Sequence, residues 1–326
     1  MFLKKTPGTI RTNLIVLIIF LILFGILSII IFMTEISTPD NFPVNQKYTV
    51  KEGWTLKQTA DELRIKHIID SPLLFTLIVS ATTGEGSIKS GTYQFSDPVS
   101  LSTVIRRITT ADYGIPIFKI TIPEGLTNSE TASILKSKLL EFDLNIFESL
   151  SKKYEGYLFP DTYSFFSNAE AEEVFYKFLS NFMAQVSKIS AEISSFRKPL
   201  HEIITMASIL EKEARLISDR KIIAGILWKR IEIGMPLQVD AAFLYINGKS
   251  TYDLTLKDLN IDSPYNTYKY KGLPPTPISN PGLDSIIASV NPTITEYLYY
   301  LSDRNGKLYF SKTYDKHVIN KKKYLN

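Results

Sequence analysis

The run of residues from Leu14 to Met33 constrains the organisation of this chain more than any other feature. It reads LIVLIIFLILFGILSIIIFM, twenty positions without a charged side chain. In a helix such a run spans about 30 Å, the thickness of the hydrocarbon core of a bilayer. A cleaved signal peptide has an apolar region of only about 7–15 residues that ends in small residues. This run ends in Ile-Ile-Ile-Phe-Met, so it predicts an uncleaved membrane anchor over residues 14–33.

The charges on either side of this run predict its orientation. Basic residues precede it and acidic residues follow it, namely Lys4, Lys5, Arg11, Glu35 and Asp40. The positive-inside rule then places residues 1–13 in the cytoplasm as a short tail and the bulk of the chain outside. Residues 34–46 are polar and contain proline, which is typical of an extended stalk. We expect a single-pass protein whose body lies outside the cytoplasm.

Composition excludes several classes of function. The 326 residues include 37 Lys and Arg against 33 Asp and Glu, a net charge of +4, which is too small an excess for a nucleic-acid binder. An apolar content of 44% and a charged content of 21% fit a globular chain. The chain has no cysteine, which excludes disulfides, thiolate metal sites and thiol nucleophiles. Its three histidines are widely spaced, so no metal site is expected.

A motif recurs at nearly one spacing in the first half of the body. Residues 50–63 (VKEGWTLKQTADEL) and 122–135 (IPEGLTNSETASIL) share Glu-Gly-x-Thr followed by Thr-Ala and Leu, at an offset of 72. A Thr-Tyr-x-Phe sequence recurs at residues 92–95 and 162–165, at an offset of 70. Two motifs at one spacing indicate a duplicated supersecondary unit. We expect each copy to run from a strand through the Glu-Gly turn into a helix capped by Thr55 or Thr127, then into a second strand.

The rest of the chain predicts mainly helices. Apolar residues recur at helical spacing over 168–195, which indicates one packing helix. Further helices are expected over His201–Arg215 and Asp219–Ile233, the latter ended by Gly234. Tyr297–Ser311 has the pattern of a β-hairpin, with Asn305-Gly306 as its tight turn. The remaining lysine-containing residues, 317–326, are interpreted as a solvated end.

Two glutamates lie in an otherwise apolar helix. In the segment Thr205–Ala214 (TMASILEKEA), a step of 100° per residue places both Glu211 and Glu213 beside apolar positions. Apolar surroundings raise the pKa of a carboxyl group, as a general acid working near neutral pH requires. The helical wheel does not choose between the two residues. The alternative is that both are solvated acids at the end of an amphipathic helix, paired with Lys212 and Arg215.

Three phrases carry a resemblance to a known family. MASILEKEA is followed by IAGILWKRIEIGMPLQVD and then by SPYNTYKYKGLPPTPISNPG. In order and spacing, these phrases resemble the endolytic murein transglycosylases of the YceG-like family, from about Gly53 to the C-terminus. The stretch Glu155–Tyr163 is also typical of that family. The resemblance implies a mixed α+β fold with an N-terminal transmembrane helix. It also implies a LysM-like subdomain over residues 47–120, followed by a catalytic domain over 121–326 that includes a helical insertion near 168–195.

The resemblance also implies an activity. The family cleaves the β-1,4 bond between N-acetylmuramic acid and N-acetylglucosamine within peptidoglycan strands, and leaves 1,6-anhydro ends. Position in the motif makes Glu211 the catalytic acid and then base, with Glu213 as the alternative acid and Ser208 beside them. No cofactor is implied. The implied partners are peptidoglycan strands, a bacterial inner membrane and cell-wall synthases.

Polar residues after the second glutamate are candidates for binding the sugar. They form two groups with side chains suited to N-acetyl sugars. The first group is Gln238 and Asp240, and the second is Tyr265, Asn266, Thr267 and Tyr268. The family usually has Thr or Ser where this chain has Val239, so no hydroxyl role is expected there. The alternative for the second group is a turn held by the Asn266 side chain.

Two further interpretations stay open from the sequence. One is a membrane-anchored scaffold without catalytic activity that binds glycan and holds cell-wall synthases through its duplicated units. The other is a muramidase that hydrolyses the same bond and leaves a reducing end.

Overall fold

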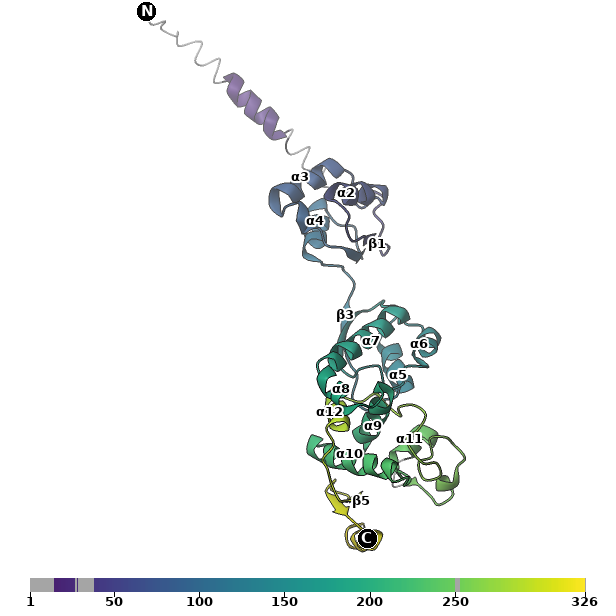
Figure 1. Cartoon of the computed structure of the whole chain (residues 1–326). Helices are drawn as coiled ribbons and strands as arrows, with labels where there is room; N and C mark the ends of the chain where they lie inside the picture. The colour runs from purple at the N-terminus through teal and green to yellow at the C-terminus, as the bar shows by residue number, and fades with distance from the viewer. Residues whose placement is uncertain (1–14, 27, 29–37, 250–252, 326) are drawn as a thin grey trace, which may run out of the picture. The chain divides into compact units, whose positions relative to one another are not determined.

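The described chain consists of two compact units. The structure is a computed structural model that describes residues 15–26, 28, 38–249 and 253–325. The first unit extends to Pro116 and the second begins at Ile117 (Figure 1). The strand that begins at Ile117 therefore belongs wholly to the second unit. Helices and strands are mixed in both units, which confirms the α+β class.

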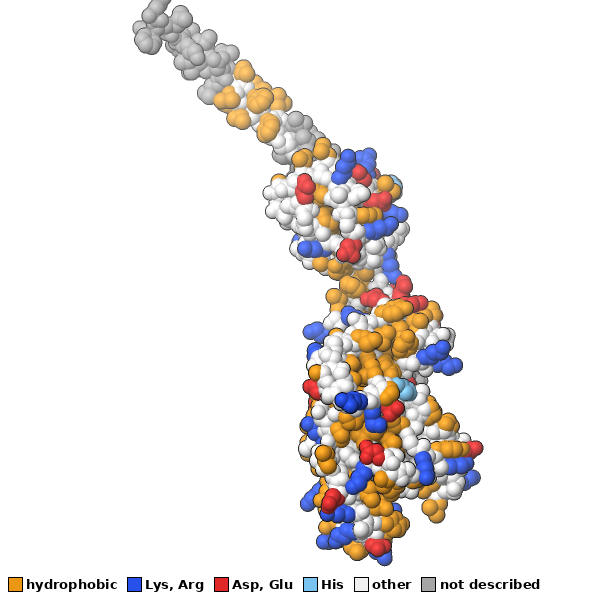
Figure 2. Space-filling view, in the orientation of Figure 1, with side chains coloured by type: hydrophobic (Ala, Val, Ile, Leu, Met, Phe, Trp, Pro, Cys, Tyr) orange, Lys and Arg blue, Asp and Glu red, His pale blue; other side chains and the backbone are white. Residues whose placement is uncertain are grey.

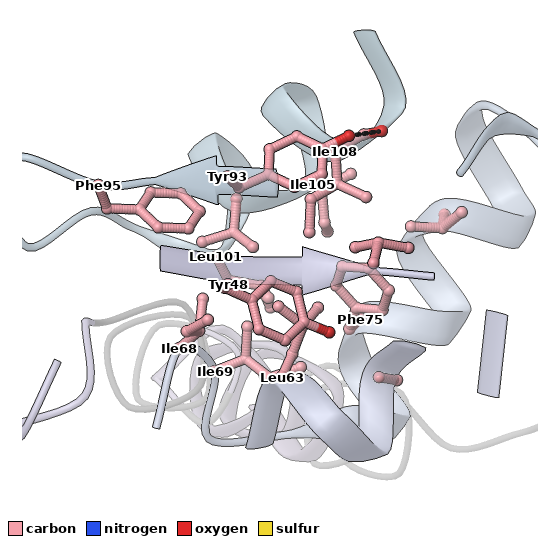
Figure 3. Close-up of a cluster of buried hydrophobic side chains, with 14 of the residues drawn as sticks. Tyr48, Leu63, Ile68, Ile69, Phe75, Tyr93, Phe95, Leu101, Ile105 and Ile108 are labelled. Atoms are coloured by element: carbon pink, nitrogen blue, oxygen red, sulfur yellow. Dashed lines mark hydrogen bonds between the residues drawn. The ribbon is translucent and has the colours of Figure 1, made fainter. Parts of the chain in front are cut away.

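The first unit is built on a two-stranded antiparallel sheet. Strand β1 (Lys47–Val50) pairs with β2 (Gly91–Gln94). Helices α2 (Leu56–Ile65) and α3 (Pro72–Thr82) and the 3₁₀ turn η1 (Glu85–Ser87) lie between the strands in sequence, and α4 (Leu101–Thr110) follows them. Tyr48, Phe75 and Tyr93 meet in the core between these elements (Figure 3). The alternation of buried and exposed residues along β1 directs Tyr48 and Val50 into this core.

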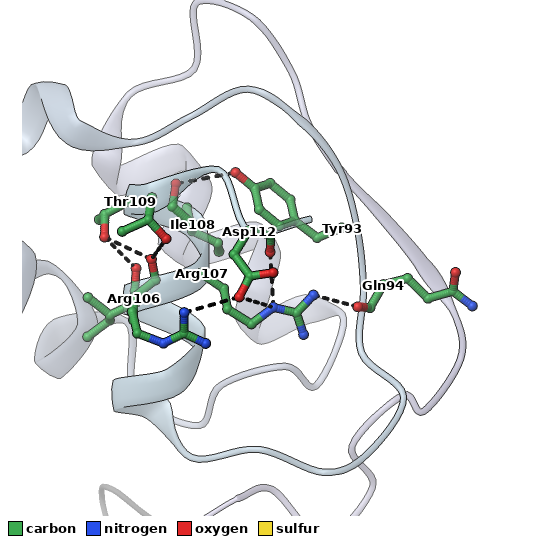
Figure 4. A network of polar contacts seen from close by, with 9 residues as sticks. Tyr93, Gln94, Arg106, Arg107, Ile108, Thr109 and Asp112 are labelled. Carbon is green, nitrogen blue, oxygen red and sulfur yellow. Dashed lines mark hydrogen bonds and ion pairs between the residues drawn. The ribbon is translucent and has the colours of Figure 1, made fainter. Parts of the chain in front are cut away.

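Arg107 ties the C-terminal segment of this unit to its sheet. Its guanidinium donates to the Gln94 carbonyl at 2.7 Å and to the Asp112 carbonyl at 3.0 Å (Figure 4). It also lies 4.3 Å from the centre of the Phe95 ring, a favourable position for a cation. These contacts join the end of α4 and the residues after it to strand β2.

The second unit opens with the same order of elements. Strand β3 (Ile117–Thr121) pairs antiparallel with β4 (Thr162–Phe166), and α5 (Asn128–Lys138) and α6 (Leu144–Ser151) lie between them. Phe178 packs on Tyr163 with their ring centres 4.2 Å apart. That residue comes from α7 (Ala171–Ser187), so the helix that follows β4 completes the core of this repeat.

The two repeats share specific interactions as well as topology. Thr55 and Thr127 each form a capping box with the residue three positions later, Gln58 or Glu130, which confirms both predicted N-caps. A pair of threonine hydroxyls crosses the strands in each copy, Thr49 with Thr92 at 2.9 Å and Thr121 with Thr162 at 2.8 Å. The glycine of each Glu-Gly turn has φ +80°, a conformation that favours glycine. The duplication predicted from the sequence is therefore present in the structure.

The remainder of the second unit is mostly helical. Its helices are α8 (Ser190–Phe196), α9 (Leu200–Glu213), α10 (Ile217–Glu232), α11 (Ala241–Asn247), the short η3 (Asp258–Asn260), α12 (Leu283–Val290) and α13 (Tyr314–Tyr324). Strands β5 (Tyr299–Ser302) and β6 (Leu308–Ser311) form the predicted hairpin. Helix α9 packs against α12, α10 and α11 (Figure 1).

The helices differ from the predictions in two places. The single helix expected over 168–195 is two helices, because the chain turns at Lys188 and Ile189 between α7 and α8. The C-terminal lysines interpreted as part of a solvated end are exposed, but they belong to α13, a helix that the sequence did not predict. Thr313 caps α13 by accepting from the Lys316 N–H, and buried Asn320 donates to Ser311 of β6, so this helix is fixed to the hairpin.

The N-terminal apolar run is only partly described. Residues 15–26 are helical, and their apolar side chains are exposed (Figure 2). Residues 1–14, 27 and 29–37 lie outside the described residues, and with them the predicted cytoplasmic tail, much of the predicted anchor over 14–33 and the start of the stalk. Across the described part of the chain, no helix has both the length and the apolar character needed to span a membrane.

Candidate active site

Helix α9, which carries both candidate glutamates, has a buried central segment and an exposed residue near each end, His201 and Lys212. Its residues from Ile203 to Leu210 are all buried, so neither Thr205 nor Ser208 faces solvent. The reason is that the 277–280 loop covers the polar side. The Ser208 hydroxyl accepts from the Ile278 N–H at 3.0 Å and donates to the Thr205 carbonyl at 2.7 Å. Ser208 therefore anchors a loop.

Glu211 lies at the last turn of α9 in a set of fixed contacts. Its Oε1 accepts from Arg220 Nη2 at 2.7 Å, and its Oε2 accepts from the Gly282 N–H at 2.9 Å. The side chains of Glu211 and Arg220 are 6% and 7% exposed. Arg220 comes from α10 and is itself held by the Ala214 carbonyl at 2.8 Å. Both oxygens of Glu211 are thus fixed by donors from two different elements.

These donors change the expectation for Glu211. The sequence predicted an uncharged carboxyl held among apolar residues. A guanidinium and a backbone N–H both stabilise the ionised form instead. The sequence gives little sign of the pair, because Arg220 stands nine positions later and reaches Glu211 only through the tight α9–α10 connection.

The loop that carries Gly282 is fixed to the second repeat by Asn280. Its side-chain amide donates to the Leu126 carbonyl and to Asn128 Oδ1, and its Oδ1 accepts from the Leu158 N–H, each at 2.9 Å. Its backbone also exchanges two hydrogen bonds of 2.8 Å with Gly125 and Leu126. The Glu-Gly turn of the second repeat is therefore part of the wall around Glu211.

Glu124, in that Glu-Gly turn, lies beside Glu211. A Cβ atom placed on Gly282 would come within 1.9 Å of Glu124 Oε1, so only glycine leaves room for this carboxyl group. Although Glu124 is an exposed residue, partial desolvation of its carboxyl group raises its pKa, and the neighbouring Glu211 carboxylate raises it further. Sequence analysis found Glu124 only as part of the repeat and did not identify it as a site residue.

Glu213 belongs to a separate cluster. The Tyr300 hydroxyl of β5 donates to its Oε2 at 3.0 Å. Burial raises the pKa of Glu213 to about 7, and the nearby Asp240 contributes to the increase. Tyr268 donates to Asp240 Oδ1 at 2.5 Å. The structure thus brings Glu213, Asp240 and Tyr268 together around Tyr300, which the sequence did not indicate.

The other predicted binding residues mostly hold the backbone. Asn266 is fully buried; its amide donates to the Leu259 and Ile261 carbonyls at 3.0 and 2.9 Å, as in the turn alternative. The Thr267 hydroxyl accepts from the Val239 N–H at 3.0 Å. Tyr265 bonds Thr276 through its hydroxyl at 2.7 Å. Gln238 is exposed and has φ +50°, a strained backbone for a residue other than glycine.

Two hollows lie away from these glutamates. One of about 440 Å³ lies between α2 and α3 and is lined by residues that include Thr55, Asp61 and Thr76. The other, of about 530 Å³, lies between β4 and α7 beside Asp161 and Asn181. Glu211 lines neither of them, so the case for the site rests on its contacts.

Comparison with known proteins places this chain in a family. A family model described as the YceG-like family matches residues 48–323. The chain is 31% identical to an endolytic murein transglycosylase of Bacillus subtilis (strain 168), over 85% of this chain and 84% of that relative. It is 29% identical to one of Streptococcus pneumoniae serotype 2, of which it spans only 58%. The crystal structure of a yceG-like protein from Listeria monocytogenes superposes with a TM-score of 0.56 at 31% identity, covering 84% of this chain and 99% of that one. The chain therefore belongs to the YceG-like family.

Proposed function

We propose that this protein is an endolytic murein transglycosylase that uses Glu211 as its acid and then its base. The substrate is a peptidoglycan strand, cut within the chain at the β-1,4 bond between N-acetylmuramic acid and N-acetylglucosamine. The names of the two bacterial relatives support this activity. The observation that carries the proposal is the position of Glu211, an almost buried carboxylate whose two oxygens are fixed by Arg220 and Gly282.

The proposed reaction needs a single carboxyl group that works twice. Glu211 donates a proton to the glycosidic oxygen, and the C1–O bond breaks with its electron pair on that oxygen. The C6 hydroxyl of the same muramic acid then attacks C1 and returns its proton to Glu211. The product is a 1,6-anhydro end, and no water is consumed. Because the nucleophile belongs to the substrate, proximity replaces the second carboxylate that glycoside hydrolases use.

Glu211→Gln tests this proposal. We expect the full chain carrying this substitution, purified in detergent, to release no anhydro-muropeptides from soluble uncrosslinked glycan strands. Glu52→Gln is the control, since it makes the same chemical change at an exposed glutamate of the first unit. Mass spectrometry separates the outcomes, because a hydrolytic product is heavier by one water. Anhydro product at the wild-type rate from Glu211→Gln would refute the assignment.

Glu213→Gln separates the two glutamates. We expect it to keep anhydro-product release, because the Glu213 carboxyl is engaged by Tyr300 in the other cluster. If this variant alone were inactive, Glu213 would be the acid. If neither variant nor the wild type released product while all three bound glycan, the non-catalytic scaffold would be the better description.

The first unit is proposed to bind the glycan strand as a LysM-like subdomain over residues 47–120. Support comes from the β1–α2–α3–β2 order and from the hollow of about 440 Å³ between α2 and α3. We also propose that residues 14–33 anchor the protein in a bacterial inner membrane with the tail inside, since the run is free of charge. Cell-wall synthases are the expected neighbours there. Protease protection of the tail in sealed vesicles tests the orientation.

A further inference from the structure

Two carboxyl groups meet at one backbone amide in the candidate site. Gly282 donates its N–H to Glu211 Oε2 at 2.9 Å, while the Glu124 carboxyl occupies the space where a side chain at 282 would begin. The two carboxyl groups therefore meet at Gly282, and the charge of Glu211 acts on Glu124. Two adjacent carboxylates repel each other when both are ionised, so such a pair retains one proton to higher pH than either group alone.

The charges around the pair determine which carboxyl keeps that proton. Arg220 of α10 forms its ion pair with Glu211. Arg220 also acts on Glu124, but burial and the Glu211 charge raise the pKa of Glu124 by more than Arg220 lowers it. Lys212 of α9 lies near the same turn, against Gly125, and Asp284 of α12 adds a negative charge that acts on Glu124. Glu211 also accepts a hydrogen bond from the Gly282 N–H. The ionised form is therefore better stabilised at Glu211, and the shared proton resides on Glu124.

We propose that Glu124 is a positioning residue that stores, beside Glu211, the proton that Glu211 delivers to the glycosidic oxygen. This inference rests on the proposed function. The proton passes from Glu124 to Glu211 and then to the leaving oxygen as the C1–O bond breaks. When the C6 hydroxyl attacks C1, its proton returns to Glu211 and then to Glu124. The pair ends the cycle with the one proton with which it began, and Arg220 offsets its remaining charge throughout.

Storage on Glu124 reconciles the two requirements on Glu211. A carboxylate fixed by a guanidinium and an N–H is well prepared to accept the proton of the C6 hydroxyl, but the same two donors do not favour a proton on it. The neighbouring acid supplies the missing proton without removing either donor. Glu211 of α9 is therefore the base of the pair, and Glu124 of the Glu-Gly turn is the acid that holds the proton.

The pH dependence of activity tests the inference. In Glu124→Gln, Glu211 loses both the neighbouring negative charge and the stored proton, while Arg220 stays in place. We expect the alkaline limb of kcat/KM for anhydro-product release to move to lower pH by about one unit or more, which is about a tenfold loss of rate per unit on that limb. Glu52→Gln, which changes the same position of the first repeat, should leave the limb at its wild-type pH.

Gly282→Ala is the second variant, and it leaves both carboxyl groups in the sequence. Its new methyl group would displace the end of the Glu124 side chain while keeping the N–H that Glu211 accepts. We expect the same shift of the alkaline limb as in Glu124→Gln. A limb at the wild-type pH in whichever of these variants folds would overturn the inference, even if activity fell equally at every pH. If wild-type protein released no anhydro product, the proposed function would fail instead.

Discussion

Asn280→Ala should show how strongly the site depends on its fixed loop. Asn280 is 1% exposed, and its side chain makes three hydrogen bonds of 2.9 Å that join the loop to the second repeat. The substitution leaves two buried groups without these partners, the Leu158 N–H and Asn128 Oδ1. The Leu126 carbonyl is not counted, because it still accepts a hydrogen bond from the Asn280 backbone N–H. At about 2 kcal/mol for each orphaned group, we expect the free energy of unfolding to fall by about 4 kcal/mol.

Thermal unfolding of the full chain measures this loss. For a unit of this size, about 4 kcal/mol corresponds to a fall in Tm of about 10 °C. Asn260→Ala is the matched control, because Asn260 is exposed and its amide makes one hydrogen bond, to the Leu256 carbonyl; its Tm should change by about 2 °C or less. Anhydro-product release should fall only in Asn280→Ala, because the Gly282 N–H is no longer held against Glu211. A Tm within about 2 °C of wild type would refute the reasoning.

Three further predictions concern the caps, the ion pair and the separate acid. Thr127→Ala and Thr55→Ala each remove a capping-box hydroxyl and should cost their own units about 1 kcal/mol in thermal unfolding; an unchanged Tm in either variant would contradict this. Arg220→Met leaves a nearly buried carboxylate unpaired, so we expect a loss of about 3–5 kcal/mol in denaturant unfolding and an alkaline limb at higher pH; an unmoved limb would count against the pairing. Burial raises the pKa of Glu213 from 4.5 to about 7. Protonated Glu213 therefore contributes fully to the stability of the fold below pH 4.5, and this contribution is lost as the pH rises through 7. As the pH rises through this range, the free energy of unfolding of Glu213→Gln should increase relative to that of wild type, by up to about 3 kcal/mol at pH 8. If the two free energies instead changed with pH in parallel, Glu213 would not titrate in this range.

Local signals in the sequence predicted local structure well. The Thr55 and Thr127 caps, the Glu-Gly turns and the Asn305-Gly306 hairpin all depend on residues within a few positions of one another, and the structure contains them. The C-terminal helix was missed although Thr313 is a cap of the same kind. Its apolar residues are too few to give a clear helical period, so the cap was its main signal.

The surroundings of α9 could not be predicted, because distant elements supply them. A helical wheel assumes that one face meets solvent, but the loop after Pro277 covers the polar face of α9 and bonds Ser208. The pairing of Glu211 with Arg220 depends on a tight turn between two helices. The structure places Asp240 and Tyr268 in one cluster with Glu213 and Tyr300, and their expected contact with sugar stays a prediction. These contacts join residues far apart in sequence, and no local pattern encodes them.

The two Glu-Gly turns show how one motif acquires different surroundings. Gly53 and Gly125 have the same φ of +80°, and each turn leads into a helix with the same capping box, so the motif is explained by local folding alone. Nothing in it distinguishes Glu52 from Glu124. The difference comes from Asn280 and Gly282, more than a hundred residues later, which fix the second turn against α9 and leave space for a carboxyl group only because position 282 has no side chain. A repeated motif is thus evidence for a repeated fold, whereas the chemistry proposed for Glu124 depends on contacts that the first copy does not share.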